Sequence, residues 1–143
     1  MKIKKEILII LGVILIIASI PFLLRYVFSD SLKIDNVSSV VLRFVYLDEE
    51  TDLTIVDEKK IKELVKILNG HVIRSSYPAC FFENNISLEF IMPNKRLSLY
   101  PALDGCPIMR ISEENKYIDI REKKLIKLKE FLFLYGFDLD YYR

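Results

Sequence analysis

Residues 86–100, ISLEFIMPNKRLSLY, decide the fold of this chain. Apolar side chains recur at every second position from Ile86 to Met92. A period of two predicts a strand that buries one of its faces. The turn Pro93–Lys95 then reverses the chain, and Arg96–Tyr100 returns beside it as a second strand. The stretch therefore predicts a β-hairpin and favours an antiparallel sheet.

The segments around this hairpin predict two helices and further strands. The first helix, Glu58–Asn69, has apolar residues at spacings i, i+3, i+4 and i+7, and Gly70 follows where a left-handed residue often ends a helix. The second helix is expected over about Arg121–Tyr135 and ends at Gly136. The other expected strands are Ser38–Leu47, Leu53–Val56, His71–Arg74, Ile108–Ser112 and Lys116–Ile120. These elements predict an α+β domain, with a largely antiparallel sheet packed by two amphipathic helices.

The N-terminal region has a different composition. Ile7–Leu24 carries no charge over 18 residues, and as a helix it spans about 27 Å, close to the hydrocarbon thickness of a bilayer. Lysines precede this run, and the positive-inside rule then places the N-terminus in the cytoplasm. We therefore expect residues 1–28 to be a cytoplasmic tip and a single transmembrane helix in contact with membrane lipid.

The same interpretation makes residues 29–37 a spacer and residues 38–143 an extracytoplasmic domain. A cleaved signal peptide, which leaves a secreted domain, is the alternative, although its apolar region is usually shorter than this one. A buried soluble helix is a third interpretation, but a helix that is apolar all round has no face for solvent.

The two cysteines, Cys80 and Cys106, are the most informative pair in the domain. An oxidising compartment favours a disulfide between them. Such a bond closes a loop of about 27 residues and contributes about 3.5 kcal/mol in the chain-entropy model. Two cysteines and the single histidine, His71, fall short of a four-ligand zinc set, so no metal site is expected.

Composition and motifs exclude several classes of function. The chain has 21 Lys and Arg against 20 Asp and Glu, which gives no basic surplus for nucleic acid. No G-x-S-x-G, H-E-x-x-H, Walker or G-x-G-x-x-G pattern occurs, so we expect no cofactor and assign no catalytic residue. The acidic residues of 48–52 are expected to form a solvated loop. A basic run at 121–129 crowds the start of the last helix, either as a solvated face or against an anionic surface.

The favoured hypothesis is a non-enzymatic binding or interaction module with a protein partner at the outer face of a membrane. The sheet face left uncovered by the helices, together with the loop around Cys106, places Tyr100, Asp104 and Arg110 as candidate binding residues. One alternative is a small hydrolase-like enzyme that uses carboxylates and His71, which requires His71 in a cleft beside a carboxylate. The other alternative is a structural membrane subunit.

Overall fold

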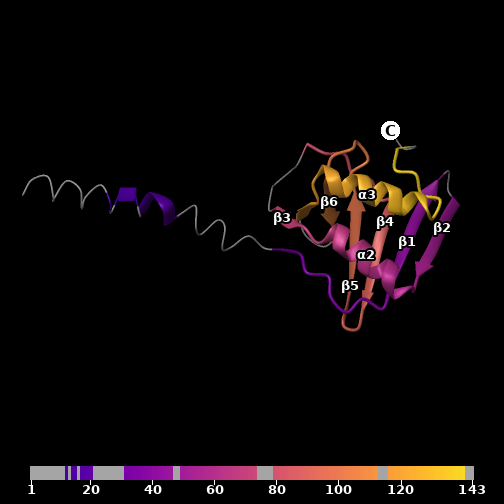
Figure 1. Cartoon of the computed structure of the whole chain (residues 1–143). Coiled ribbons are helices and arrows are strands. Elements are labelled where there is room, and N and C mark those ends of the chain that lie inside the picture. Colours follow the sequence, from indigo (N-terminus) through magenta and orange to yellow (C-terminus); the bar gives the residue numbers. More distant parts are fainter. Residues whose placement is uncertain are drawn as a thin grey trace, which may run out of the picture. The chain divides into compact units, whose positions relative to one another are not determined.

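A computed structural model describes residues 31–46, 49–73, 79–112 and 116–140, and in the N-terminal region residues 12, 14, 15 and 17–20. The chain divides into two compact units, Met1–Asp30 and Ser31–Arg143. The described residues of the first unit are helical. The second unit is the α+β domain, and its antiparallel sheet and two described helices agree with the class expected from the sequence (Figure 1).

The domain contains a sheet of seven strands in the order β2-β1-β4-β5-β6-β7-β3, and every adjacent pair is antiparallel. The predicted hairpins β4–β5 and β6–β7 are confirmed. The strands are β1 (Ser39–Tyr46), β2 (Glu49–Ile55), β3 (His71–Ile73), β4 (Ile86–Met92), β5 (Lys95–Pro101), β6 (Ile108–Ile111) and β7 (Tyr117–Asp119). Strand β3 leaves the hairpin order and pairs with β7 at one edge.

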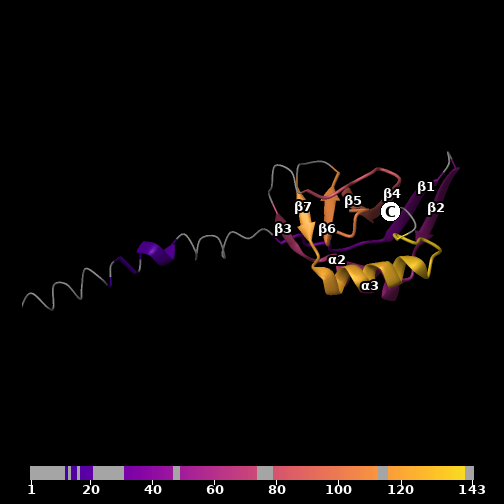
Figure 2. The same ribbon diagram turned by 90° about the horizontal axis from the view of Figure 1, so that it is seen from above.

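Helices α2 (Glu58–Leu68) and α3 (Glu122–Phe133) lie side by side on one face of the sheet (Figures 1 and 2). Helix α2 begins at Asp57, whose carboxylate accepts a hydrogen bond from the Lys60 amide at 3.0 Å. Helix α3 ends at Phe133, two residues before the predicted end, and Gly136 then takes a left-handed φ of 85° while the Phe137 amide donates back to the Leu132 carbonyl.

The core lies between the helices and the sheet. Its strand residues occupy alternate positions, which the register brings onto one face: Leu42, Leu88, Phe90, Leu99, Met109 and Ile118 are 0 to 1% exposed. Leu64 and Leu68 of α2 and Leu128 and Leu132 of α3 pack against this face. The two amphipathic patterns of the sequence thus meet in a single hydrophobic core.

The predicted transmembrane helix is contradicted. Among the described residues, no helix is both long and apolar enough to cross a membrane. The expected single-pass topology, with a cytoplasmic N-terminus and an extracytoplasmic domain, is corrected with it. Most of Ile7–Leu24 and the lysines before it lie outside the described residues. The uniform apolar character that suggested a membrane span is a property of composition, whereas a span also requires one continuous helix.

Three smaller expectations also change. Residues 31–37, expected as a spacer, pack on the domain: Ile34 is 2% exposed, and the Leu32 amide donates to the Gly70 carbonyl at 3.2 Å. The acidic residues from Glu49 onward belong to β2 rather than to a loop. Gly70 is not left-handed, because α2 ends at Asn69 in an extended conformation. The reason for a glycine at position 70 is steric and concerns the site described next.

Candidate functional site

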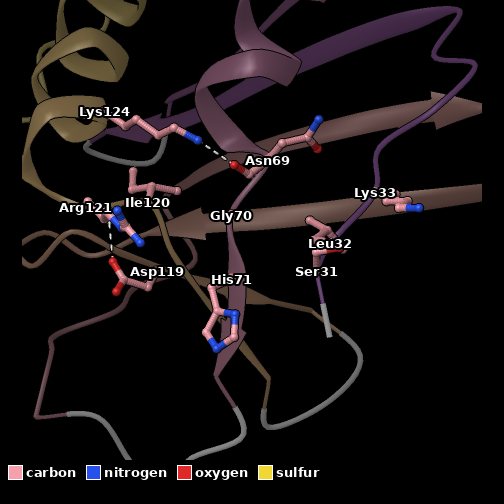
Figure 3. Close-up of a pocket in the computed structure, with 10 residues that line it drawn as sticks. All are labelled: Ser31, Leu32, Lys33, Asn69, Gly70, His71, Asp119, Ile120, Arg121 and Lys124. Carbon is pink, nitrogen blue, oxygen red and sulfur yellow. Dashed lines mark hydrogen bonds between the residues drawn. The ribbon is translucent and has the colours of Figure 1, made fainter. Parts of the chain in front are cut away.

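A cavity of ≈ 460 Å³ opens where two helix–strand connections meet. Because β3 pairs with β7, the connection from α2 to β3 lies beside the connection from β7 to α3. The cavity is lined by residues 31–33, 69–71 and 119–121 and by Lys124 (Figure 3). It thus collects three segments that are far apart in the sequence.

Gly70 allows these connections to approach closely. A Cβ atom at this position would lie 2.6 Å from the Asp119 carbonyl oxygen and 2.6 Å from Ile118 Cγ2. Contacts this short do not occur, and the carbonyl belongs to backbone that cannot turn aside. Any other residue at position 70 therefore separates β3 from β7 and widens the cavity.

Arg121 is the strained residue of the cavity. Its backbone has φ 61° and ψ 155°, a region that is essentially restricted to glycine and costs about 1–3 kcal/mol for other residues. The Arg121 amide donates to Asp119 Oδ1 at 2.8 Å, and its carbonyl accepts from the Lys124 and Leu125 amides at 3.1 and 3.0 Å. These bonds hold the conformation. Among the described residues, the exposed guanidinium has no hydrogen-bond or ion-pair partner.

A second cation, Lys124, lies one turn further along α3. Its ammonium group donates to the Asn69 carbonyl at the end of α2, at 2.5 Å, which places positive charge at a helix C-terminus. Lys33 also lines the cavity, but in Figure 3 its ammonium group points away from Arg121 and Lys124. The cationic side of the cavity is therefore formed by the start of α3.

His71 lines this cavity together with a carboxylate, that of Asp119. It is the register partner of Asp119 across β3 and β7, and Ser31 forms a bridge with it on the other side. Paired residues of antiparallel strands project to the same face, so a hydroxyl, an imidazole and a carboxylate lie in a row. No hydrogen bond joins these three side chains among the described residues.

The structure brings together two of the three binding residues predicted from the sequence. Tyr100 and Arg110 are register partners on β5 and β6, and the guanidinium carbon lies 4.8 Å from the Tyr100 ring centroid. Both project from the face opposite α2 and α3, because their neighbours Leu99 and Met109 point into the core. Phe82 also packs beside the Arg110 guanidinium, at 5.9 Å. These contacts hold Arg110 between aromatic rings at a half-buried position.

Asp104, the third predicted residue, lies in the loop beside the cysteines. The predicted disulfide between Cys80 and Cys106 is present, with 6.0 Å between the Cα atoms. The Asp104 carboxylate accepts hydrogen bonds from the Phe81 amide at 3.0 Å and from the Cys106 amide at 3.1 Å. Asp104 thus connects the same two segments as the disulfide. In the oxidised protein its hydrogen bonds stabilise this loop.

Sequence reasoning missed Arg121, Lys124 and Asp119 as members of one site. The available signal was the basic run at the start of the last helix, since positive charge is unfavourable at a helix N-terminus. No pattern in the sequence indicates that β3 pairs with β7, and this pairing alone assembles the cavity. Comparison with protein-family models, with curated proteins and with solved structures found no match.

Proposed function

We propose that the domain is a binding module for a small anion, such as a phosphorylated or carboxylated compound, held in the cavity at the start of α3. The observation that carries this proposal is Arg121, an arginine kept in a backbone conformation that suits glycine. Strain of this kind persists where the surrounding structure enforces it and often accompanies function. A glycine here would relieve the strain but would remove the guanidinium.

The charges of the cavity support an anion rather than a neutral ligand. A guanidinium offers several N–H donors in a planar arrangement that matches phosphate and carboxylate oxygens. Lys124 adds a second positive charge, and among the residues that the structure describes Asp119 is the single carboxylate that lines the cavity. One oxygen of Asp119 accepts the Arg121 amide, so this carboxylate positions the backbone that presents the guanidinium.

A second groove of the domain has a weaker positive charge. It lies between α2 and α3, with a volume of ≈ 480 Å³. Glu63 and Glu130 offset most of the positive charge contributed by its lysines, which include Lys66 and Lys127. Its three lysines against two glutamates leave a net charge of +1, whereas the described lining of the Arg121 cavity has three cations against one carboxylate, a net charge of +2. The cavity at Arg121 is therefore the better candidate.

Titration of the full chain with inorganic phosphate tests the proposal, with amide chemical shifts recorded by NMR. We expect shifts at Arg121, Lys124 and His71 that saturate with a single dissociation constant. The variant Arg121→Gln should weaken binding about 10-fold or more, because a charge-assisted hydrogen bond contributes about 1.5–3 kcal/mol. Lys123→Gln is the matched control, since Lys123 is an exposed cation in the same turn of α3 but does not line the cavity.

Two results would contradict the proposal. Equal dissociation constants for Arg121→Gln and the parent protein would show that the guanidinium does not bind the anion. An equal loss in Arg121→Gln and Lys123→Gln would show that phosphate responds only to the general charge of the helix surface, with no specific site.

A hydrolytic activity is a second candidate, supported by the row formed by Ser31, His71 and Asp119. A hydroxyl, an imidazole and a carboxylate in this order are the groups of a nucleophile, a general base and the group that orients the base. Arg121 would then bind the anionic part of an ester substrate. The three side chains need to approach hydrogen-bonding distance only when substrate binds, because catalytic hydrogen bonds often tighten only with substrate.

Release of nitrophenol from a p-nitrophenyl ester and from p-nitrophenyl phosphate tests this candidate. We expect His71→Gln and Ser31→Ala to abolish any turnover while the phosphate dissociation constant stays within about twofold, since both variants keep Arg121 and Lys124. Turnover that persists in both variants would eliminate the triad and leave the binding function standing.

A further inference from the structure

The disulfide loop brings a carboxylate next to the two sulfur atoms. Asp104 Oδ2 lies 3.5 Å from Cys106 Sγ. One oxygen of Asp104 and the sulfur atoms of Cys80 and Cys106 all lie within 4.8 Å of one another. Asp104 is exposed and both cysteines are partly exposed, so the group is open to solvent. Two sulfurs and a carboxylate oxygen are ligand types that zinc takes in proteins.

Backbone hydrogen bonds hold the same segments together without the disulfide. The Leu103 amide donates to the Phe81 carbonyl at 2.9 Å, and the Phe81 amide donates to Asp104 at 3.0 Å. The Cys106 amide also donates to Asp104, at 3.1 Å. These bonds involve no sulfur atom, so breaking the sulfur–sulfur bond removes none of their donors or acceptors. The two thiols of the reduced protein therefore stay near each other and near the carboxylate.

We propose that the reduced protein binds one Zn²⁺ ion, or a similar thiophilic divalent cation, through the sulfurs of Cys80 and Cys106 and the carboxylate of Asp104. A tetrahedral zinc ion with two thiolate ligands requires about 3.8 Å between the sulfurs, given zinc–sulfur bonds of about 2.3 Å. The present spacing of the ligand atoms allows this geometry with small side-chain rotations. A water molecule completes the fourth position.

The disulfide and the metal site exclude each other. A dithiol reductant gives two electrons and two protons to the disulfide, which yields two protein thiols and the oxidised reductant. The cation then replaces the two thiol protons, which are released to solvent, and the resulting thiolates and carboxylate outweigh its charge. An oxidant such as a disulfide then takes two electrons from the two thiolates and two protons from solvent and becomes two thiols, while the Cys80–Cys106 bond re-forms. Two of the three ligands are thereby lost and the cation is released. The loop therefore binds the metal ion when the cysteines are reduced and releases it when they are oxidised.

The test uses the full chain, reduced with a phosphine that is then removed under anaerobic conditions, and titrated with Co²⁺ as a spectroscopic probe. We expect one equivalent of Co²⁺ to give a thiolate-to-metal band in the near ultraviolet and the visible bands of tetrahedral cobalt. Zn²⁺ should displace it. The oxidised protein should show neither band, because its sulfurs are bonded to each other.

The variant Asp104→Asn separates the carboxylate from the two thiols. It keeps one oxygen, which can accept either the Phe81 amide or the Cys106 amide, now bound to Oδ2 and Oδ1, so the amide NMR spectrum of this variant is compared with that of the parent protein. We expect Co²⁺ affinity to fall about tenfold or more, because a neutral amide is a poor zinc ligand. Asp138→Asn is the matched control, since Asp138 likewise accepts the amide two residues on, from Asp140 at 2.9 Å, and should bind Co²⁺ unchanged.

Amide NMR spectra of the reduced protein establish whether the domain remains folded. A folded, reduced protein that binds no Co²⁺ would overturn the proposal, and so would a reduced protein that unfolds and gains no structure with Zn²⁺. Equal Co²⁺ affinities of Asp104→Asn and the parent protein would show that Asp104 is not a ligand and that the two thiols alone bind the metal ion. Anion binding at Arg121 is measured in the oxidised protein, so its failure is independent of each of these results.

Discussion

The backbone amide of Arg121 donates a hydrogen bond to Asp119 Oδ1 at 2.8 Å, and this bond helps to hold a φ of 61° at a residue with a side chain. The two residues flank Ile120, which is 1% exposed and fixes the connection to the core. The hydrogen bond and the buried Ile120 together fix residues 119–121 between β7 and α3. The Arg121 side chain, which follows β7, lines the cavity. Stability and the proposed anion binding place opposite demands on position 121.

Arg121→Gly should therefore raise the free energy of unfolding by about 1 kcal/mol, because the relieved strain exceeds the entropy that glycine adds to the unfolded chain. Urea denaturation of the oxidised protein measures this change. Arg121→Ala is the control: it removes the same charge but keeps a Cβ atom, so it should not stabilise. Equal stabilisation by both variants would assign the effect to charge at the helix N-terminus rather than to backbone strain.

Gly70→Ala should lower the free energy of unfolding by about 1–3 kcal/mol, because the new methyl group meets the Asp119 carbonyl at 2.6 Å and the sheet must open. Gly136→Ala gives the comparison. Nothing lies within 4 Å of a Cβ atom at position 136, and only the φ of 85° opposes the change.

Asparagine distinguishes these two causes, since it tolerates left-handed backbone but is larger than alanine. Gly136→Asn should recover most of the stability lost in Gly136→Ala, whereas Gly70→Asn should be worse than Gly70→Ala. Thermal unfolding ranks the four variants by their melting temperatures. A Gly70→Ala protein as stable as the parent would show that β3 and β7 separate without cost.

Reduction of the disulfide should lower the free energy of unfolding by about 3.5 kcal/mol, because the Cys80–Cys106 bond spans a sequence separation of 26 and restricts the unfolded chain. Denaturation with and without a phosphine, in a metal-free buffer, measures the difference. A Cys80→Ser, Cys106→Ser double variant should have the same free energy of unfolding as the reduced protein, and the phosphine should not change it. A loss far below this figure would mean that the reduced, unfolded chain already keeps the two cysteine segments close together.

Acid should weaken the β1–β2 edge of the sheet. A hydrogen bond from the Arg43 guanidinium, at 3.0 Å, lowers the pKa of Asp52, and the Asp52 carboxylate in turn raises the pKa of Arg43. Because the folded-state pKa of Asp52 lies below the unfolded value, this pair stabilises the fold above the unfolded pKa. The contribution is lost as the pH falls through the lower, folded-state pKa.

The variant Asp52→Asn measures that contribution. Its free energy of unfolding should fall less steeply than that of the parent as the pH drops below about 4, the ordinary range for an aspartate. Added salt should reduce the difference at neutral pH, since both side chains are 43% exposed and screened by solvent. Identical acid profiles for the two proteins would mean that the ion pair contributes nothing to the fold.

The local patterns of the sequence predicted most of the secondary structure of the domain. The alternation over 86–92, the helical spacing of Ile61, Leu64 and Leu68, and the glycine at 136 each depend on residues within a few positions, and the structure confirms them. The cysteine pair was also predictable, because only one disulfide can form from two cysteines. The length and apolar composition of Ile7–Leu24 led instead to a transmembrane helix that the described residues do not support.

Tertiary structure alone decided the sheet order, and with it the sites. Strand β3 pairs with β7, which lies more than forty residues away, and no local signal distinguishes this partner from the other strands. That pairing brings His71 beside Asp119 and places Arg121 at the cavity. The folded loop likewise sets Asp104 against the cysteines. Sequence determined which elements form because their signals are short in range, whereas function-bearing contacts arise between elements and depend on the packing of the whole core.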